Sequence, residues 1–303
     1  MKDKYKYSTS QLFNFAKDSY LERTSRPIYA MVFLLPFIIF YEVGTFCINT
    51  DILNQSQIRV VAFVWLQNLL ESLGFGGKFA WVAPPLAVVV ILIALQITSA
   101  KQWRFWIGDI LPMTAECILL AVPLIVLTLF LSSSAGPEGN ISWFDDSAIR
   151  AQAGSLPSCS SVPGSSLSSM SAEAGDVEPG QSLLANIITG IGAGIYEELV
   201  FRLILICLLM LLFQDVLRLT HMKSIVFSVL ISAALFSAHH HIIFVDGQLG
   251  QTAVFNWTEF CFRTIAGIYF AVLFAFRGFG VTAGTHAFYD IIATIINVVF
   301  FQQ

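Results

Sequence analysis

Apolar residues form long blocks along the chain, and more polar segments separate these blocks. Each block is close to the length of about 20 residues that an α-helix needs to cross a bilayer. The blocks lie at residues 28–48, 79–98, 105–132, 183–213, 224–245, 256–276 and 280–301. This pattern predicts an all-α fold, a polytopic transmembrane helix bundle with seven spans.

An eighth apolar stretch, residues 58–75, is shorter and amphipathic, so it either spans or lies at the membrane interface. The distribution of lysine and arginine favours the second alternative. With the N-terminus in the cytoplasm and this stretch not spanning, only Arg59, Lys78 and Arg150 among the loop residues fall on the outer side. We therefore predict a protein of the cell membrane with seven spans, or eight as the alternative. Its N-terminus is predicted to lie in the cytoplasm.

Composition agrees with a membrane protein. Apolar residues make up 56% of the 303 residues and charged residues 12%, whereas soluble domains carry about 25% charged residues. The five cysteines show no ligand-type spacing, so neither a zinc ribbon nor a redox motif is indicated. We expect the lipid bilayer as a partner and no nucleic acid.

The chain divides into four segments at changes in composition. Residues 1–27 are polar and are predicted to form a cytoplasmic segment, and residues 28–132 form the N-terminal membrane scaffold. Residues 133–182 are rich in Ser, Gly and Pro, which is typical of a flexible loop, here an external one. Residues 183–303 hold the remaining four spans.

Three charged residues lie inside the block at 183–213. A charge at the centre of a membrane helix costs roughly 2.5–3.5 kcal/mol, so such residues need polar neighbours. Glu198 and Arg202 are four residues apart, which puts them in reach of an ion pair on one helix face. Glu197 points about 100° away and is left available for other chemistry. Gly190 and Gly194 form a small-xxx-small face that allows close approach of another helix.

Polar residues recur on two further apolar blocks. Three consecutive histidines, 239–241, stand near the end of the block at 224–245, while His286 and Asp290 lie one turn apart on the last block. A lone histidine on an apolar face is usually a satisfied core group. Polar residues on three of four consecutive spans instead predict that these side chains come together in one site.

The order of these motifs resembles the CPBP family of intramembrane proteases, which includes CAAX prenyl endopeptidases and bacteriocin-processing or immunity proteins. The motifs read Glu-Glu-x-x-x-Arg, Phe-x-x-x-His and His-x-x-x-Asn/Asp, over roughly residues 183–301. The matching residues are Glu197, Glu198 and Arg202, then Phe236 and His240, then His286 and Asp290. His239 and His241 remain alternatives to His240, and Asp290 stands where many relatives carry asparagine.

The resemblance implies a catalytic core in residues 183–303 that hydrolyses a peptide bond. Glu197 would take a proton from a water that His240 holds, and His286, oriented by Asp290, would stabilise the oxyanion. Glu198, Arg202 and Phe236 would support these groups. No cofactor is favoured, because the chain has no His-Glu-x-x-His pair; the alternative is a zinc ion held by Glu197, His240 and His286.

The predicted helix boundaries do not show whether these side chains lie at the same depth in the membrane. At 1.5 Å per residue, His286 lies ~9 Å from the start of its block and His240 ~24 Å along its own. On these boundaries the two histidines come from opposite faces of the membrane, unless helix tilt or a shifted boundary brings them together.

The expected function is therefore an intramembrane endopeptidase acting on a membrane-associated or lipidated protein or peptide. Two alternatives come from other classes. A proton-coupled transporter would use buried Glu, His and Asp as a relay, but it predicts inverted repeats that the first three spans do not show. A non-catalytic membrane scaffold or immunity protein would keep the fold and tolerate Gln at position 197.

Overall fold

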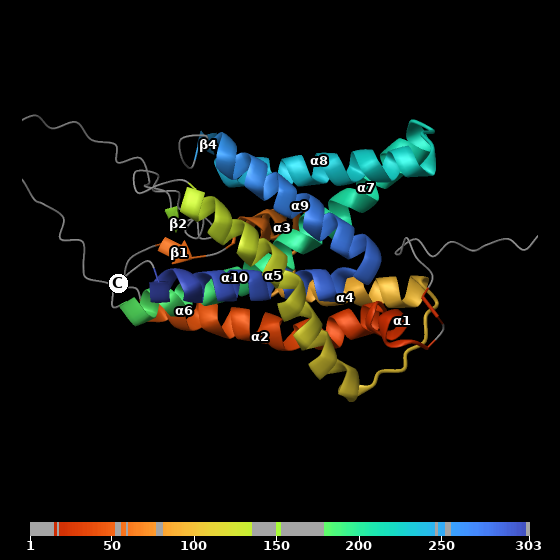
Figure 1. The fold of residues 1–303 in the computed structure, drawn as a ribbon, viewed down its shortest axis with the longest axis horizontal. Helices are drawn as coiled ribbons and strands as arrows, with labels where there is room; N and C mark the ends of the chain where they lie inside the picture. Colours follow the sequence, from red (N-terminus) through yellow and green to blue (C-terminus); the bar gives the residue numbers. More distant parts are fainter. Residues whose placement is uncertain are drawn as a thin grey trace, which may run out of the picture.

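The structure, a computed structural model, describes residues 15–16, 18–51, 56–58, 60–76, 81–134, 150–152, 179–245, 248–251 and 256–300. The described chain is a bundle of long helices that run side by side along one axis (Figure 1). Most of the predicted loop at 133–182, and the N-terminal segment before residue 15, lie outside the described residues. Helix α1 and the end of α10 lie at opposite ends of the bundle (Figure 1).

Helices follow the apolar blocks closely. The long ones are α2 (Pro27–Asp51), α5 (Ile110–Ser134), α6 (Pro179–Glu198), α8 (His221–His241), α9 (Trp257–Arg277) and α10 (Phe279–Phe300). Helix α6 continues through η3 (Leu199–Leu205), α7 (Ile206–Leu211) and η4 (Leu212–Val216), of which η3 and η4 are π-helical. The shorter helices are α1 (Tyr20–Thr24), α3 (Val61–Ser72), α4 (Ala83–Thr98) and the 3-10 turn η2 (Ile107–Asp109).

Two short antiparallel strand pairs accompany the helices in the described chain. Strand β1 (Ser56–Ile58) pairs with β2 (Arg150–Gln152), and β3 (Ile242–Val245) pairs with β4 (Gln248–Gln251). The second pair extends the chain directly beyond the end of α8.

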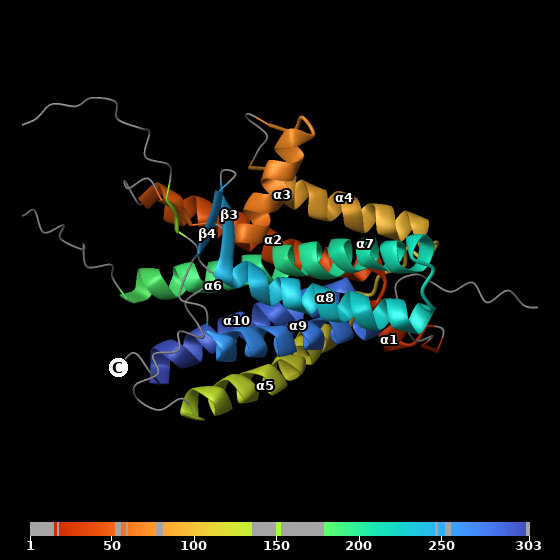
Figure 2. The same cartoon turned by 90° about the horizontal axis from the view of Figure 1, so that it is seen from above.

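The predicted membrane helix bundle is confirmed. Six helical segments of the described chain are long and apolar enough to cross a membrane, and α4, at 16 residues, is a shorter apolar helix in the place of the second predicted block. Helix α3 has 12 residues, which is about 18 Å against a hydrocarbon core of about 30 Å. It also lies across the direction of the long helices (Figure 2). Its length and direction support seven crossings over eight.

Helix α6 is held against α10 by small residues. A Cβ atom added at Gly194 would stand 2.5 Å from the backbone nitrogen of Ala287, and one added at Gly190 would stand 2.6 Å from Cβ of Asp290. No side chain fits into either gap, so the two backbones approach as closely as the small-xxx-small face predicts. This contact brings the end of α6 next to the first turns of α10.

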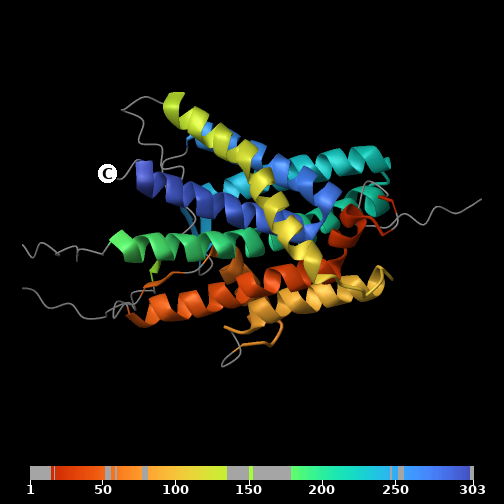
Figure 3. The ribbon, with the colours of Figure 1, turned by 60° about the horizontal axis from the view of Figure 1, so that its bottom comes forward.

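Helix α5 runs obliquely across α10 (Figure 3). Its residues Ala121 and Leu124 pack with Phe262 and Phe270 of α9 and with Tyr289 of α10 in a separate apolar cluster. This cluster closes the side of the bundle opposite to α2.

Ion pairs join the helices at the end of the bundle where α1 lies. Arg277, the last residue of α9, donates to Glu116 of α5 (2.7 Å) and to Thr24 of α1 (2.8 Å). Arg23 of α1 forms a two-pronged pair with Asp109, both distances being 2.9 Å. Bidentate arginine–carboxylate pairs fix geometry well, so these contacts set the relative positions of α1, α5 and α9.

Candidate active site

The two adjacent glutamates at the end of α6 face different partners. Glu198 is fully buried and its Oε2 lies 3.1 Å from Nε of Arg202, which is also fully buried. The ion pair predicted from the four-residue spacing is therefore confirmed. The Arg202 guanidinium lies over the ring of Phe236, 4.1 Å from its centroid, a cation–π contact that further compensates a buried charge.

The π-helical segment η3 begins immediately after Glu198 and carries Arg202. Wide helical turns of this kind occur often at functional sites. Helix α8 is attached to this segment, because the hydroxyl of Ser232 donates a hydrogen bond of 2.7 Å to the carbonyl of Phe201. The attachment places the last turns of α8 beside the glutamates.

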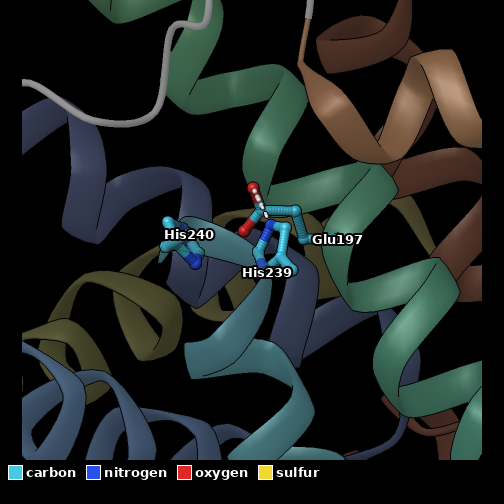
Figure 4. Close-up of side chains that lie close together, drawn as sticks. All are labelled: Glu197, His239 and His240. Atoms are coloured by element: carbon cyan, nitrogen blue, oxygen red, sulfur yellow. Dashed lines mark ion pairs between the residues drawn. The ribbon is translucent and has the colours of Figure 1, made fainter. Parts of the chain in front are cut away.

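Glu197 faces the histidines of α8. Its Oε1 lies 3.5 Å from Nε2 of His239, and ligand atoms of Glu197, His239 and His240 all lie within 4.8 Å of one another. Figure 4 shows the ring of His239 directed at the carboxylate, with His240 beside it. Glu197 and His239 are nearly inaccessible to solvent, at 3% and 6% exposure.

One backbone carbonyl orients both histidines. The carbonyl oxygen of Phe236 lies 2.6 Å from Nδ1 of His239 and 3.0 Å from Nδ1 of His240. A carbonyl only accepts hydrogen bonds, so each Nδ1 is the donor. In the neutral form of each ring the lone pair is then on Nε2. The acceptor Nε2 of His239 thus faces the Glu197 carboxylate, and a ring nitrogen of His240 lies close to both.

His286 belongs to a neighbouring polar group. Its Nδ1 lies 2.7 Å from Oε1 of Glu198, and its Nε2 lies 3.5 Å from Oδ2 of Asp290. The ring stacks on Phe270 with centroids 4.5 Å apart and an angle of 18°. Glu198 therefore bridges Arg202 and His286, whereas the sequence pattern assigned it to the arginine alone.

Phe236 connects the two polar groups. Its ring centroid lies 5.1 Å from that of His240 and 6.1 Å from that of His286. The apparent separation of these histidines in depth disappears because α8 is displaced along its axis relative to α10 (Figure 2). All seven residues of the three motifs accordingly gather around one region of the bundle.

The N-terminal part of the chain also reaches this region, which the sequence did not predict. Trp65 of α3 lies 5.7 Å from the ring of His239 and 6.4 Å from that of Phe201. Phe63 of the same helix packs edge-on against Tyr196, at 5.0 Å. The only sequence signal for this contact was the amphipathic character of residues 58–75. Residues 28–132 are thus more than a scaffold around the motifs.

Among the described residues, one set of side chains has the geometry to hold a metal ion: Glu197, His239 and His240. Three protein ligands with nitrogen and oxygen atoms fit the ligand set of a catalytic zinc site, and a carbonyl on the far nitrogen is the usual support of a zinc-bound histidine. This set differs from the predicted one, because His239 stands where His286 was expected.

Comparison with known proteins places part of the chain in a family. No curated protein and no solved structure matches the chain. Residues 179–292, which include helices α6 to α9, most of α10 and all the motif residues, match the family model described as type II CAAX prenyl endopeptidase Rce1-like. This membrane protein therefore carries an Rce1-like region, and the resemblance to the CPBP intramembrane proteases is confirmed over that region.

Proposed function

We propose that this protein is an intramembrane endopeptidase that hydrolyses a peptide bond in a prenylated, membrane-associated protein or peptide. The match to the Rce1-like family supports the reaction class. The observation that carries the mechanism is the convergence of the Glu197 carboxylate with Nε2 of His239, 3.5 Å away, and with a ring nitrogen of His240.

The convergence suits a single water molecule. A carboxylate and an imidazole Nε2 are both acceptors, so a water between them donates its two hydrogens and turns a lone pair outward. Glu197 then accepts one proton as the water oxygen attacks the carbonyl carbon of the scissile bond. Either His239 or His240 completes this site, and Nε2 of His239 lies 3.5 Å from the Glu197 carboxylate.

His286 is suited to stabilise the tetrahedral oxyanion. Its two ring nitrogens face carboxylate oxygens, one of Glu198 and one of Asp290. The doubly protonated imidazolium therefore attracts both carboxylates. A cation placed in advance beside the reacting carbonyl stabilises the charge that develops there. The C–N bond then breaks, and the proton held by Glu197 passes to the leaving amine.

Zinc is the second candidate because the same three side chains fit its ligand set. Glu197, His239 and His240 would hold the ion, which when bound would supply Lewis-acid polarisation and a bound water of lowered pKa. In that case Glu197 would be a ligand, and a separate base would have to act.

The test is cleavage of a prenylated peptide in proteoliposomes by wild type, Glu197→Gln and the matched control Asp215→Asn. Gln keeps the shape of Glu197 and removes its basicity, so we expect activity to fall by at least about a thousandfold. Asp215 is exposed in η4 and far from the motifs in sequence, so its variant should retain wild-type activity. Thermal melting of each variant checks that the protein is folded.

Chelation separates the two chemistries. Retained activity after exhaustive chelation, with an inactive Gln variant, supports water activation by glutamate. Loss on chelation with recovery on added zinc supports the metal site instead. Full activity of the Gln variant would refute both mechanisms, whereas a wild type that cleaves no peptide would favour a non-catalytic scaffold.

A further inference from the structure

Helix α10 is held at two places by α5, which lies outside the Rce1-like region. Arg277, two positions before the start of α10, donates a hydrogen bond of 2.7 Å to Glu116 of α5. Farther along, the hydroxyl oxygens of Tyr289 in α10 and Thr128 in α5 lie 2.9 Å apart, and both residues are buried. The Thr128 hydroxyl donates to the carbonyl of Leu124 at 2.9 Å, so Tyr289 is the donor in this pair.

The two contacts lie on either side of His286. Glu116 and Thr128 are 12 positions apart in α5, and Arg277 and Tyr289 are also 12 positions apart. Helix α5 rises ~18 Å over this interval at 1.5 Å per residue, and it crosses α10 there (Figure 3). His286 stands nine positions after Arg277 and three before Tyr289. A movement of α10 along its axis would therefore disturb both contacts together.

The packing between these two contacts is made at glycines of α10. A Cβ atom added at Gly284 would stand 2.9 Å from Sγ of Cys117, and one added at Gly280 would stand 3.0 Å from Cε of Met113. Such van der Waals contacts fix how closely the helices approach, but a glycine face has no side chain to oppose sliding along the axis. Hydrogen bonds are directional, so the two contacts with α5 are the groups that determine the axial position.

The chemistry proposed for His286 depends on that axial position. Its Nδ1 lies 2.7 Å from Oε1 of Glu198, which belongs to α6, whereas Asp290 belongs to α10 and moves together with the histidine. An axial displacement of α10 would lengthen the contact with Glu198 and move the imidazole away from the carbonyl that Glu197 and its water attack. A misplacement of about 1 Å can cost on the order of a hundredfold in rate.

We infer that α5, through the Thr128–Tyr289 and Glu116–Arg277 contacts, fixes the axial position of α10 and thereby places His286 for oxyanion stabilisation. The inference rests on the proposed function and adds residues of the N-terminal spans to it. Thr128 and Glu116 are positioning residues in this role, because they act through α10 and not on the reacting atoms.

The experiment removes the hydroxyl pair without leaving a buried polar group behind. Thr128→Val and Tyr289→Phe together replace both partners by apolar groups of similar shape, which is nearly neutral for stability, so the double variant should melt close to wild type. Its kcat for a prenylated peptide in proteoliposomes should fall about tenfold to a hundredfold with KM unchanged, because the oxyanion exists only after binding. Thr128→Ser keeps the hydroxyl and should retain the wild-type kcat.

Thr114→Val is the matched control. Its hydroxyl also belongs to α5 but donates within its own helix, to the carbonyl of Ile110 at 3.0 Å, so the variant should keep the wild-type kcat. Glu116→Gln examines the other contact, because an amide loses the charge that holds Arg277. It should also lower kcat at unchanged KM.

A second measurement needs no substrate. The short hydrogen bond between Nδ1 of His286 and Glu198 should give the imidazole N–H a strongly downfield proton resonance in the detergent-solubilised protein, which His286→Asn assigns. This resonance should shift in the Thr128→Val/Tyr289→Phe double variant and stay in place in Thr114→Val.

The outcomes separate the inference from the proposed function. If either the kcat or the His286 resonance of the double variant stays at the wild-type value, α5 does not position His286 and the inference is wrong, while the endopeptidase stands. A wild type that cleaves no peptide would refute the proposed function, and the resonance alone then decides whether α5 places α10.

Discussion

Removing the Arg202 side chain should destabilise the protein strongly. Both Arg202 and its partner Glu198 are fully buried, 3.1 Å apart. Breaking a buried ion pair from one side costs roughly 3–5 kcal/mol, because the remaining charge is left uncompensated. Glu198 keeps one partner, since Nδ1 of His286 lies 2.7 Å from its other oxygen. We therefore expect Arg202→Ala to lower the free energy of unfolding by about 3 kcal/mol, the lower end of that range.

The assay is thermal unfolding of the purified protein in detergent. A loss of about 3 kcal/mol corresponds to a fall in Tm on the order of 10 °C for a chain of this size. Arg202→Lys keeps the charge and loses the planar contact over Phe236, so its Tm should lie between those of wild type and the alanine variant. Arg104→Ala is the surface control, because Arg104 is exposed, and we expect a change within about 0.5 kcal/mol.

One result would refute this reasoning. If Arg202→Ala melts with the same Tm as the Arg104 control, the pair with Glu198 contributes nothing to stability, and a structural role for the arginine is wrong. If Arg202→Ala is stable but inactive, the arginine acts on the chemistry through Glu198 and His286 instead.

Three further predictions concern other parts of the molecule. Asp290→Asn should lower kcat several-fold at neutral pH, because the Asp290 carboxylate lies 3.5 Å from Nε2 of His286 and favours the imidazolium that stabilises the oxyanion; an unchanged or higher kcat would show that this carboxylate is not needed. Gly194→Leu should prevent α6 from packing on Ala287 and lower the free energy of unfolding by at least about 3 kcal/mol. Its control, Gly108→Ala, has nothing within 4 Å of the added Cβ and should melt like wild type. Cysteines introduced in the loop at 133–182 should react with an impermeant thiol reagent from outside intact cells; reaction only after lysis would reverse the predicted orientation.

Much of the architecture followed from the sequence because its causes are local. The length of each apolar block sets whether a helix can cross a bilayer, and all seven blocks contain a helix in the structure. The spacing of Glu198 and Arg202 is one helical turn, so their ion pair depends on a single helix. The glycine face of α6 likewise predicted a close neighbour, although not which helix it would be.

The identity of the histidine next to Glu197 could not be read from the sequence. Three consecutive histidines on a helix point in three directions. Which of them faces Glu197 depends on how α8 is rotated and displaced against α6. Two contacts across helices decide this, the hydrogen bond from Ser232 to Phe201 and the approach of His239 to Glu197. The sequence favoured His240, and the structure brings both His239 and His240 to the carboxylate.

The sequence alone therefore determined the spans, the motif residues and the charge pair within one helix, because periodicity and hydrophobicity act along the chain. The tertiary structure decided that Glu198 is shared between Arg202 and His286, and that Trp65 of α3 reaches His239. Glu198 and His286 are 88 positions apart in the sequence, and Trp65 and His239 are 174 positions apart. Such contacts depend on helix rotation and axial offset, which are set by side-chain packing between helices and leave no periodic signal in either segment.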